Sequence, residues 1–380
     1  MFKRSIEAHV LKLASQFPVV TVTGPRQSGK TTLVKNLFQD KPYVNLEELD
    51  LRQFAKNDPK AFLAFYKDGA VIDEAQYAPE LFSYIQARVD HNDVAGEFIL
   101  TGSQNFLMME KITQSLAGRV GIVELLPLSY LEIASNPDEA HDLYDVIRQG
   151  SYPRLYKSKI DPQVFYKTYV QTYVERDLRQ IKNIENLDTF QRFMKLCAAR
   201  VGQLFSLSAV AMECGISQNT VKDWLSLLKT SYIAFTLPPY FNNFNKRAVK
   251  QQKLYFYDTG LVCSLLDIDN ITPLHPFKGA LFENFIILEL IKYRWNQLKK
   301  HNLYFWRDSH GHEVDLIFEQ YDVLRPIEIK ASQTISHDFY KELAYFQGIS
   351  NCQDGYLIYG GSADLPKNTL SWKNMYCALL

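Results

Sequence analysis

The most constraining feature of the sequence is a short loop bracketed by two glycines, which stands between an apolar segment and an amphipathic one. Residues 19–23 are apolar or β-branched, and residues 24–31 follow them with the pattern G-x-x-x-x-G-K-T. Glycines let such a loop curl until successive backbone N–H groups point at one anion, and the positive end of the next helix adds to the attraction. The spacing therefore predicts a phosphate-binding loop between a β-strand and an α-helix.

The residues of this loop have separate expected roles in binding ATP. The Lys30 ammonium is placed to contact the β- and γ-phosphates, and the Thr31 hydroxyl to ligate Mg²⁺. We therefore expect ATP and Mg²⁺ as cofactors. The ATP-binding residues predicted from the pattern are Gly24, Pro25, Arg26, Gln27, Ser28, Gly29, Lys30, Thr31 and Thr32.

An acidic pair, Asp73 and Glu74, directly follows the apolar segment 70–72. Ligands of parallel α/β sheets bind beyond the carboxyl ends of the strands, where this pair is expected. Asp73 is then the Mg²⁺-side carboxylate, and Glu74 orients or deprotonates the attacking water. Alone, the pair is equally consistent with the acidic start of a helix. In combination with the loop, it predicts an ATPase.

Three more residues are candidates for contact with the γ-phosphate. Thr101 and Ser103 end the apolar segment 97–100 and either sense the phosphate or cap the following helix. Arg119 is a candidate catalytic arginine that stabilises charge, acting within its own chain or from a neighbouring subunit. The sequence leaves these alternatives open, and with them the oligomeric state.

The pattern of expected elements divides the chain into three parts. Apolar strands alternate with helices in residues 1–150, which predicts an α/β domain with a parallel sheet. Residues 151–270 are mainly helical. Within them, a helix at 208–214, a turn at Gly215, a helix capped by Ser217 and two strands resemble a winged helix-turn-helix. Residues 271–380 return to an α/β pattern.

Composition excludes several classes of protein. The chain has 42 basic and 42 acidic residues, so its net charge points to no partner and any basic surface must be local. The 5 cysteines contain no C-x-x-C pair, which favours free thiols over a disulfide framework. No signal peptide or bilayer-length apolar run is visible, and we expect a cytoplasmic protein without a membrane partner.

Short motifs spread over nearly the whole chain resemble those of prokaryotic AAA-type ATPases that carry a C-terminal domain of unknown function. The resemblance implies an AAA+-like or STAND-like core, a winged-helix segment and a restriction-endonuclease-like tail. The matching motifs are residues 24–31, 72–76 (IDEAQ), 100–103 (LTGS), 116–119 (LAGR), 150–154 (GSYPR), 173–178 (YVERDL), 255–261 (YFYDTGL) and 279–284 (GALFEN).

The last part also resembles the PD-(D/E)XK nucleases. Glu328 and Lys330 are two residues apart and share one face of a strand, and Asp315 and Glu283 precede them in the expected order. The resemblance implies that the two strand carboxylates hold Mg²⁺ or Mn²⁺ and that the lysine stabilises the hydroxide or the developing charge. An isolated E-x-K spacing also fits a solvated strand face.

The sequence leaves two functions open. In the first, ATP binding and hydrolysis control a metal-dependent nuclease in the tail. In the second, the core is a nucleotide-controlled switch, and a catalytically silent tail binds DNA, RNA or a protein partner. The winged-helix segment either contacts DNA or covers the core as a lid. Its candidate phosphate-contacting residues are Gln218, Asn219, Lys222, Lys229, Lys246, Arg247, Lys250 and Lys253.

Overall fold

The computed structural model describes residues 2–103, 112, 114–136, 142–175, 184, 186–241, 250–321, 323–350 and 352–380. These residues fold into two compact units. The N-terminal unit comprises Met1–Pro137, Tyr152–Lys157 and Trp295–Lys299, and the C-terminal unit comprises Asp138–Ser151, Ser158–Arg294 and Lys300–Leu380. In the described part of the chain, no helix is long and apolar enough to cross a membrane.

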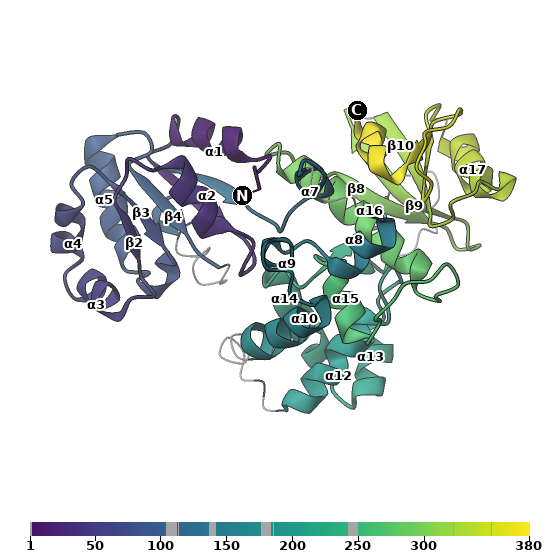
Figure 1. Ribbon diagram of the computed structural model, residues 1–380, viewed down its shortest axis with the longest axis horizontal. Coiled ribbons are helices and arrows are strands. Elements are labelled where there is room, and N and C mark those ends of the chain that lie inside the picture. Colours follow the sequence, from purple (N-terminus) through teal and green to yellow (C-terminus); the bar gives the residue numbers. More distant parts are fainter. Residues whose placement is uncertain are drawn as a thin grey trace. The chain divides into compact units, whose positions relative to one another are not determined.

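The N-terminal unit is built on a parallel sheet with the strand order β2-β3-β4-β1-β5 (Figure 1). This confirms the predicted α/β fold and the strands expected at residues 19–23, 70–72 and 97–100. Because β-branched residues dominate strands that are buried on both faces, each strand reads as an apolar run. The strands are β1 (Val19–Thr23), β2 (Tyr43–Asn45), β3 (Ala70–Asp73), β4 (Phe98–Thr101) and β5 (Val120–Glu124).

Helices cover both faces of this sheet (Figure 1). Alternate residues of one strand pack on opposite sides: Val20 and Val22 face α1 and α2, whereas Val19 faces the side of α3, α4 and α5. Neither α3 nor α4 was predicted from the sequence. The helices of this unit are α1 (Glu7–Ala14), α2 (Lys30–Leu37), α3 (Leu49–Asn57), α4 (Pro59–Phe65), η1 (Ala75–Tyr77), α5 (Leu81–Asn92), α7 (Tyr130–Ala134) and α9 (Pro153–Ser158).

The C-terminal unit joins a helical array to a second sheet, with the order β12-β11-β10-β9-β8. Its helical elements are α8 (Leu143–Gln149), α10 (Pro162–Tyr169), η2 (Val170–Glu175), α12 (Leu187–Ala198), α13 (Leu207–Cys214), α14 (Gln218–Thr230), α15 (Thr259–Leu265), α16 (Lys278–Trp295), η3 (His337–Tyr340), α17 (Lys341–Ser350) and η4 (Trp372–Leu379). Its strands are β6 (Ala234–Leu237), β7 (Lys253–Phe256), β8 (Leu303–Arg307), β9 (Glu313–Gln320), β10 (Val323–Lys330), β11 (Tyr356–Tyr359) and β12 (Thr369–Ser371).

Hydrogen bonds to main-chain atoms connect residues 151–270 to residues 271–380. The Asn284 side chain of α16 accepts a hydrogen bond from Phe256 N–H (2.7 Å) and donates one to the Phe256 carbonyl (2.9 Å). Tyr240 N–H donates to the Phe305 carbonyl on β8 (2.7 Å). The boundary predicted at residue 270 therefore falls inside one compact unit.

The predicted helix-turn-helix segment has the expected elements. Gly215 ends α13 with φ 69°, and the Ser217 hydroxyl accepts from Thr220 N–H (3.1 Å), which caps α14. β6 and β7 pair antiparallel. Residues 242–249, which carry Lys246 and Arg247, lie outside the described residues, as do residues 176–178 of the motif 173–178. The winged-helix assignment stays a prediction.

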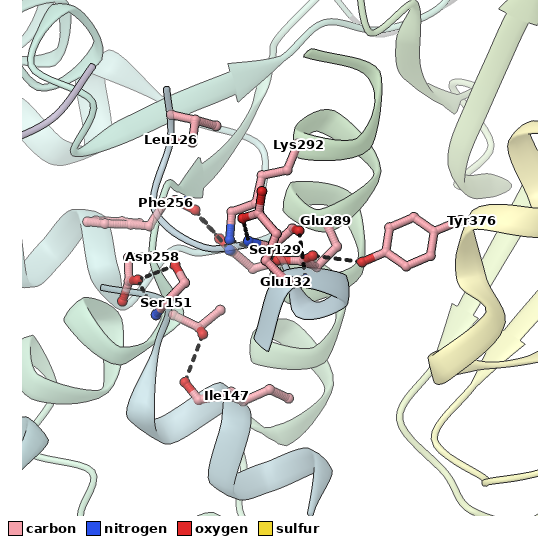
Figure 2. Close-up of polar contacts among 12 residues, drawn as sticks. Leu126, Ser129, Glu132, Ile147, Ser151, Phe256, Asp258, Glu289, Lys292 and Tyr376 are labelled. Carbon is pink, nitrogen blue, oxygen red and sulfur yellow. Dashed lines mark hydrogen bonds and ion pairs between the residues drawn. The ribbon is translucent and has the colours of Figure 1, made fainter. Parts of the chain in front are cut away.

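The motifs 150–154 and 255–261 meet at one buried carboxylate, that of Asp258 (Figure 2). It accepts hydrogen bonds from Ser151 N–H (2.8 Å), the Ser151 hydroxyl (2.7 Å) and the Tyr166 hydroxyl (2.5 Å). It also caps α15 through Leu261 N–H. A Cβ on Gly150 would lie 2.0 Å from the Tyr166 hydroxyl oxygen, so the glycine is required for this contact. The two motifs therefore form one structural joint.

Replacing Asp258 with alanine should destabilise the C-terminal unit by about 3 kcal/mol, because four buried donors lose their acceptor. The urea midpoint, followed by far-UV circular dichroism, reports this loss. The control is Asp161→Ala, which removes an exposed cap of α10 and should cost about 1 kcal/mol. Equal midpoints for the two variants would contradict the role assigned to Asp258.

Candidate functional site

The loop 24–31 has a backbone that only glycine permits at its two ends. Gly24 has φ 141° and Gly29 has φ 98°. A Cβ on Gly24 would lie 2.2 Å from the Leu125 carbonyl oxygen, which belongs to the segment after β5. Gly29 is the N-cap of α2, so the unpaired N–H groups of the first helical turn lie at the end of this loop. The local geometry is that of an anion-binding loop.

Lys30 curls back over the loop. Its ammonium donates to the carbonyl oxygens of Gly24 (3.0 Å) and Pro25 (2.8 Å), and the residue is 5% exposed. Burial lowers the pKa of Lys30 to about 8, and the carboxylates of Glu74 and Asp73 oppose this shift. A phosphate in the loop would place a counter-charge in direct contact with this buried ammonium.

Asp73, at the end of β3, accepts hydrogen bonds from three hydroxyl groups. Thr31 (2.7 Å) and Tyr43 (2.6 Å) donate to Oδ2, and Thr101 donates to Oδ1. Burial, together with the hydrogen bond to Asp73, raises the pKa of Tyr43, so its phenol remains a donor. Thr31 and Asp73 are neighbouring oxygen donors, the type of ligand that Mg²⁺ prefers, and they therefore fit the expected ion.

Glu74 follows with φ 53°, a left-handed conformation that turns the chain out of β3. Gln76 donates from its amide nitrogen to Glu74 Oε2 and to the Ser103 hydroxyl (3.2 Å). Thr101 and Ser103 are thus brought beside the acidic pair, as the phosphate-sensing hypothesis requires. The alternative, a helix cap, involves residues 104–111, which lie outside the described residues.

Arg119 lies at the other end of the sheet. It precedes β5, and its carbonyl accepts from Val19 N–H at the start of β1, whereas the loop 24–31 follows the end of β1. Its guanidinium pairs with Asp90 on the surface. The alternative in which Arg119 reaches the γ-phosphate of its own chain is therefore wrong, because the length of the sheet separates the two positions. Action from a neighbouring subunit stays a prediction.

Tyr43 was not identified as a site residue from the sequence. It looks like an ordinary aromatic strand residue, since only its pairing with Val71 of β3 places it next to Asp73. The sequence offered only a weak signal for this role, because a tyrosine at the start of a strand belongs to no recognised motif.

The four residues of the predicted nuclease-like site divide into two groups in the C-terminal unit. Asp315 and Glu328 are grouped with Lys330, whereas Glu283 pairs with a lysine from outside the predicted set. Lys330 bridges Glu328 and Asp315 (3.3 Å to Oδ2), and Ile329 N–H also donates to Asp315 (2.9 Å). Burial, and then the Asp315 carboxylate, raise the pKa of Glu328 to about 8. Burial raises the pKa of Glu283 as well.

The second lysine is Lys253 of β7, a candidate phosphate-contacting residue of the winged-helix segment, and its burial excludes that contact. It is 2% exposed and pairs with Glu283 (3.1 Å) and Glu313 (2.5 Å). Tyr255 donates to the same Glu283 oxygen (2.5 Å). Within the described residues, no three or more His, Cys, Asp or Glu side chains are grouped to hold a metal ion. The carboxylates of the predicted site pair with the ammonium groups of Lys330 and Lys253, and a metal there stays a prediction.

Replacing Gly24 with alanine should abolish nucleotide binding and lower the stability of the N-terminal unit by at least about 2 kcal/mol, because the new Cβ meets the Leu125 carbonyl. Gly118→Ala is the matched control: its φ is also positive (76°), but a Cβ there meets nothing within 4 Å. Thermal unfolding with and without ATP measures both effects. Retained binding in Gly24→Ala would contradict the assigned geometry.

Comparison with known protein families assigns descriptions to three stretches of the chain. Residues 16–134 match the AAA domain, residues 140–272 match a domain of unknown function (DUF8612), and residues 278–379 match another domain of unknown function (DUF4143). This chain is 32% identical over 340 residues to two uncharacterized proteins, Rv2008c of Mycobacterium tuberculosis and Mb2031c of Mycobacterium bovis. Each alignment covers 88% of this chain and 75% of the relative.

Solved structures give weaker likenesses. The Walker-type ATPase PABY2304 of Pyrococcus abyssi has a TM-score of 0.47 at 14% identity and covers 70% of this chain and 96% of its own. AMPPCP-bound DnaA from Aquifex aeolicus has a TM-score of 0.32 at 16% identity and covers 59% of this chain and 85% of its own. The assignment to a family therefore depends on the sequence relatives.

Proposed function

Because the chain belongs to the AAA-domain protein family of Rv2008c and Mb2031c and carries an AAA-type ATPase domain, we propose that its N-terminal unit hydrolyses ATP with Mg²⁺ at the loop 24–31. One observation carries the proposal. Lys30, Thr31, Asp73 and Glu74 come from separate segments and lie together at the carboxyl ends of β1 and β3.

The roles of the residues follow from this arrangement. The N–H groups of the loop and the Lys30 ammonium bind the phosphates, which removes the charge from water at little reorganisation cost. Thr31 and Asp73 would hold Mg²⁺, which neutralises charge on the β- and γ-phosphates. Glu74 orients the attacking water and accepts its proton, and Gln76 holds the Glu74 carboxylate in place.

Lys30→Ala should abolish ATP binding, because the phosphates lose their buried counter-charge. Glu74→Gln should keep binding and slow hydrolysis by about 100-fold or more, since the water loses its base. Filter binding and phosphate release on the full chain measure the two effects. ATPase rates equal to wild type in both variants would refute the proposed site.

A second question is what the ATPase controls. The ion pairs of Lys253 and Lys330 favour a C-terminal part that binds a partner over one that cleaves nucleic acid. The ammonium of Lys253 pairs with Glu283, the helix carboxylate of the predicted site, and with the neighbouring Glu313. Lys330 pairs with Asp315 and Glu328, the two strand carboxylates that a metal would need. We propose that the ATPase controls the tail as a binding element, and that ion pairs there support the structure. The exposed residues Gln218, Asn219 and Lys222 on α14 are the surface proposed to contact DNA or RNA.

Wild-type protein should leave plasmid and single-stranded DNA intact with Mg²⁺ or Mn²⁺, and Lys330→Ala should change nothing in that assay. Cleavage that depends on Lys330 would restore the nuclease hypothesis. Lys253→Met should lower the free energy of unfolding by about 3 kcal/mol, since it leaves two partly buried carboxylates without a cation. The control is an exposed ion pair: Lys341→Met, which loses its contact with Asp338, should leave the unfolding midpoint nearly unchanged.

A further inference from the structure

The N-terminal segment, which no motif covers, contributes a buried arginine to the nucleotide loop. Arg4 is 7% exposed, and each of its three guanidinium nitrogens donates. Nη1 donates to the Ser28 carbonyl inside the loop (2.8 Å), Nη2 to the Leu126 carbonyl (2.7 Å) and Nε to Glu132 (3.1 Å). Arg4 therefore connects the loop 24–31 to the segment between β5 and α7.

Glu132 fixes the arginine in turn. Its carboxylate accepts from Ser5 N–H (2.7 Å) and from Ser129 N–H (2.9 Å), and the latter contact belongs to the capping box of α7 (Figure 2). With 3% exposure, Glu132 is a buried counter-charge. Each nitrogen of the guanidinium thus has a protein acceptor, and the charge has a neutralising partner, so Arg4 supports the loop and adds little net charge for phosphate.

The bond to Ser28 has a specific geometrical effect. In a trans peptide the C=O and the following N–H point in opposite directions, and no cis peptide is present among the described residues. Holding the Ser28 carbonyl on the Arg4 side therefore turns the Gly29 N–H to the other side. Rotation of this peptide group changes the φ angle of Gly29, which is 98° here, and glycine restricts that angle less than any other residue.

We propose that Arg4 is a positioning residue of the ATP site, which locks the Ser28–Gly29 peptide so that the Gly29 N–H is presented to the phosphates. The inference rests on the proposed ATPase function and adds residues 4 and 132 to its site. Arg4 does not touch the nucleotide; it sets the direction of a backbone donor before binding, which lowers the ordering cost that binding must meet.

The decisive variant is Arg4→Lys, which keeps the charge but carries its donors on one nitrogen and so cannot reproduce the planar fork that reaches three separate acceptors. Its dissociation constant for a fluorescent ATP analogue with Mg²⁺ should rise about tenfold, and KM for ATP should rise similarly while kcat at saturation changes less than about twofold. The full chain is used throughout.

Arg88→Lys is the matched control. Arg88 also pairs with a buried carboxylate, Glu97 (2.6 Å), and donates to the carbonyls of Leu63 and Tyr66, but Glu97 lies directly before β4, at the end of the sheet opposite the loop. This variant should lose melting temperature and keep wild-type affinity. A general structural role for Arg4 predicts that both variants lower the melting temperature and that neither changes KM.

The outcomes separate the two levels of inference. Wild-type protein that binds no ATP would remove the proposed function and this inference with it. Wild-type binding that Lys30→Ala abolishes and Arg4→Lys leaves unchanged would overturn the role of Arg4 alone. If Arg4→Lys does not fold, Glu132→Gln keeps the shape of the partner and removes its charge. That variant should weaken binding about threefold, and unchanged affinity would also overturn the role.

Discussion

The parallel pairing of β1, β3 and β4 is the constraint on which the site depends. With Val20 opposite Ile99 and Ile72 opposite Leu100, the three strands end at one edge of the sheet. This edge therefore brings together the loop after β1, the acidic pair at the end of β3 and Thr101 of β4. The Asp73 carboxylate lies at the centre of this edge, because it accepts hydrogen bonds from hydroxyl groups of three different elements.

Buried charge has a different use in the C-terminal unit. Lys253, Lys330 and Lys292 each pair with carboxylates inside the protein, and Tyr376 of η4 donates to Glu289 (2.8 Å), the partner of Lys292 (Figure 2). Ion pairs of this kind cost desolvation when they form and are expensive to break, so they fix which elements lie together. Here the Lys253–Glu283 ion pair holds β7 against α16, and the Tyr376–Glu289 hydrogen bond holds η4 against the same helix.

The buried lysines of the two units differ in whether a carboxylate already pairs with them. In the N-terminal unit, the Lys30 ammonium donates to two carbonyl oxygens and burial lowers its pKa, so an added anion improves its surroundings. In the C-terminal unit, the ammonium of Lys253 already has its carboxylates. The first arrangement is prepared for a ligand, whereas the second is satisfied by the chain itself.

The sequence by itself determined the parallel sheet, the positions of its strands and the grouping of Lys30, Thr31, Asp73 and Glu74. These depend on local chemistry: apolar runs form buried strands, and glycine at 24 and 29 permits a conformation that other residues do not. α3 escaped prediction because no side chain caps its first turn, and α4 escaped it although Asp58 caps the helix and Pro59 begins it.

Only the tertiary structure decided which charged residues face one another. Arg119 and Lys253 looked like residues available to phosphate, yet the structure pairs the first with Asp90 at the far edge of the sheet and buries the second beside Glu283. Arg4 and Tyr43 carried no motif and proved to touch the loop and Asp73. The physical reason is that a motif records the order of residues along the chain, whereas the partner of a charge depends on which distant segment packs against it.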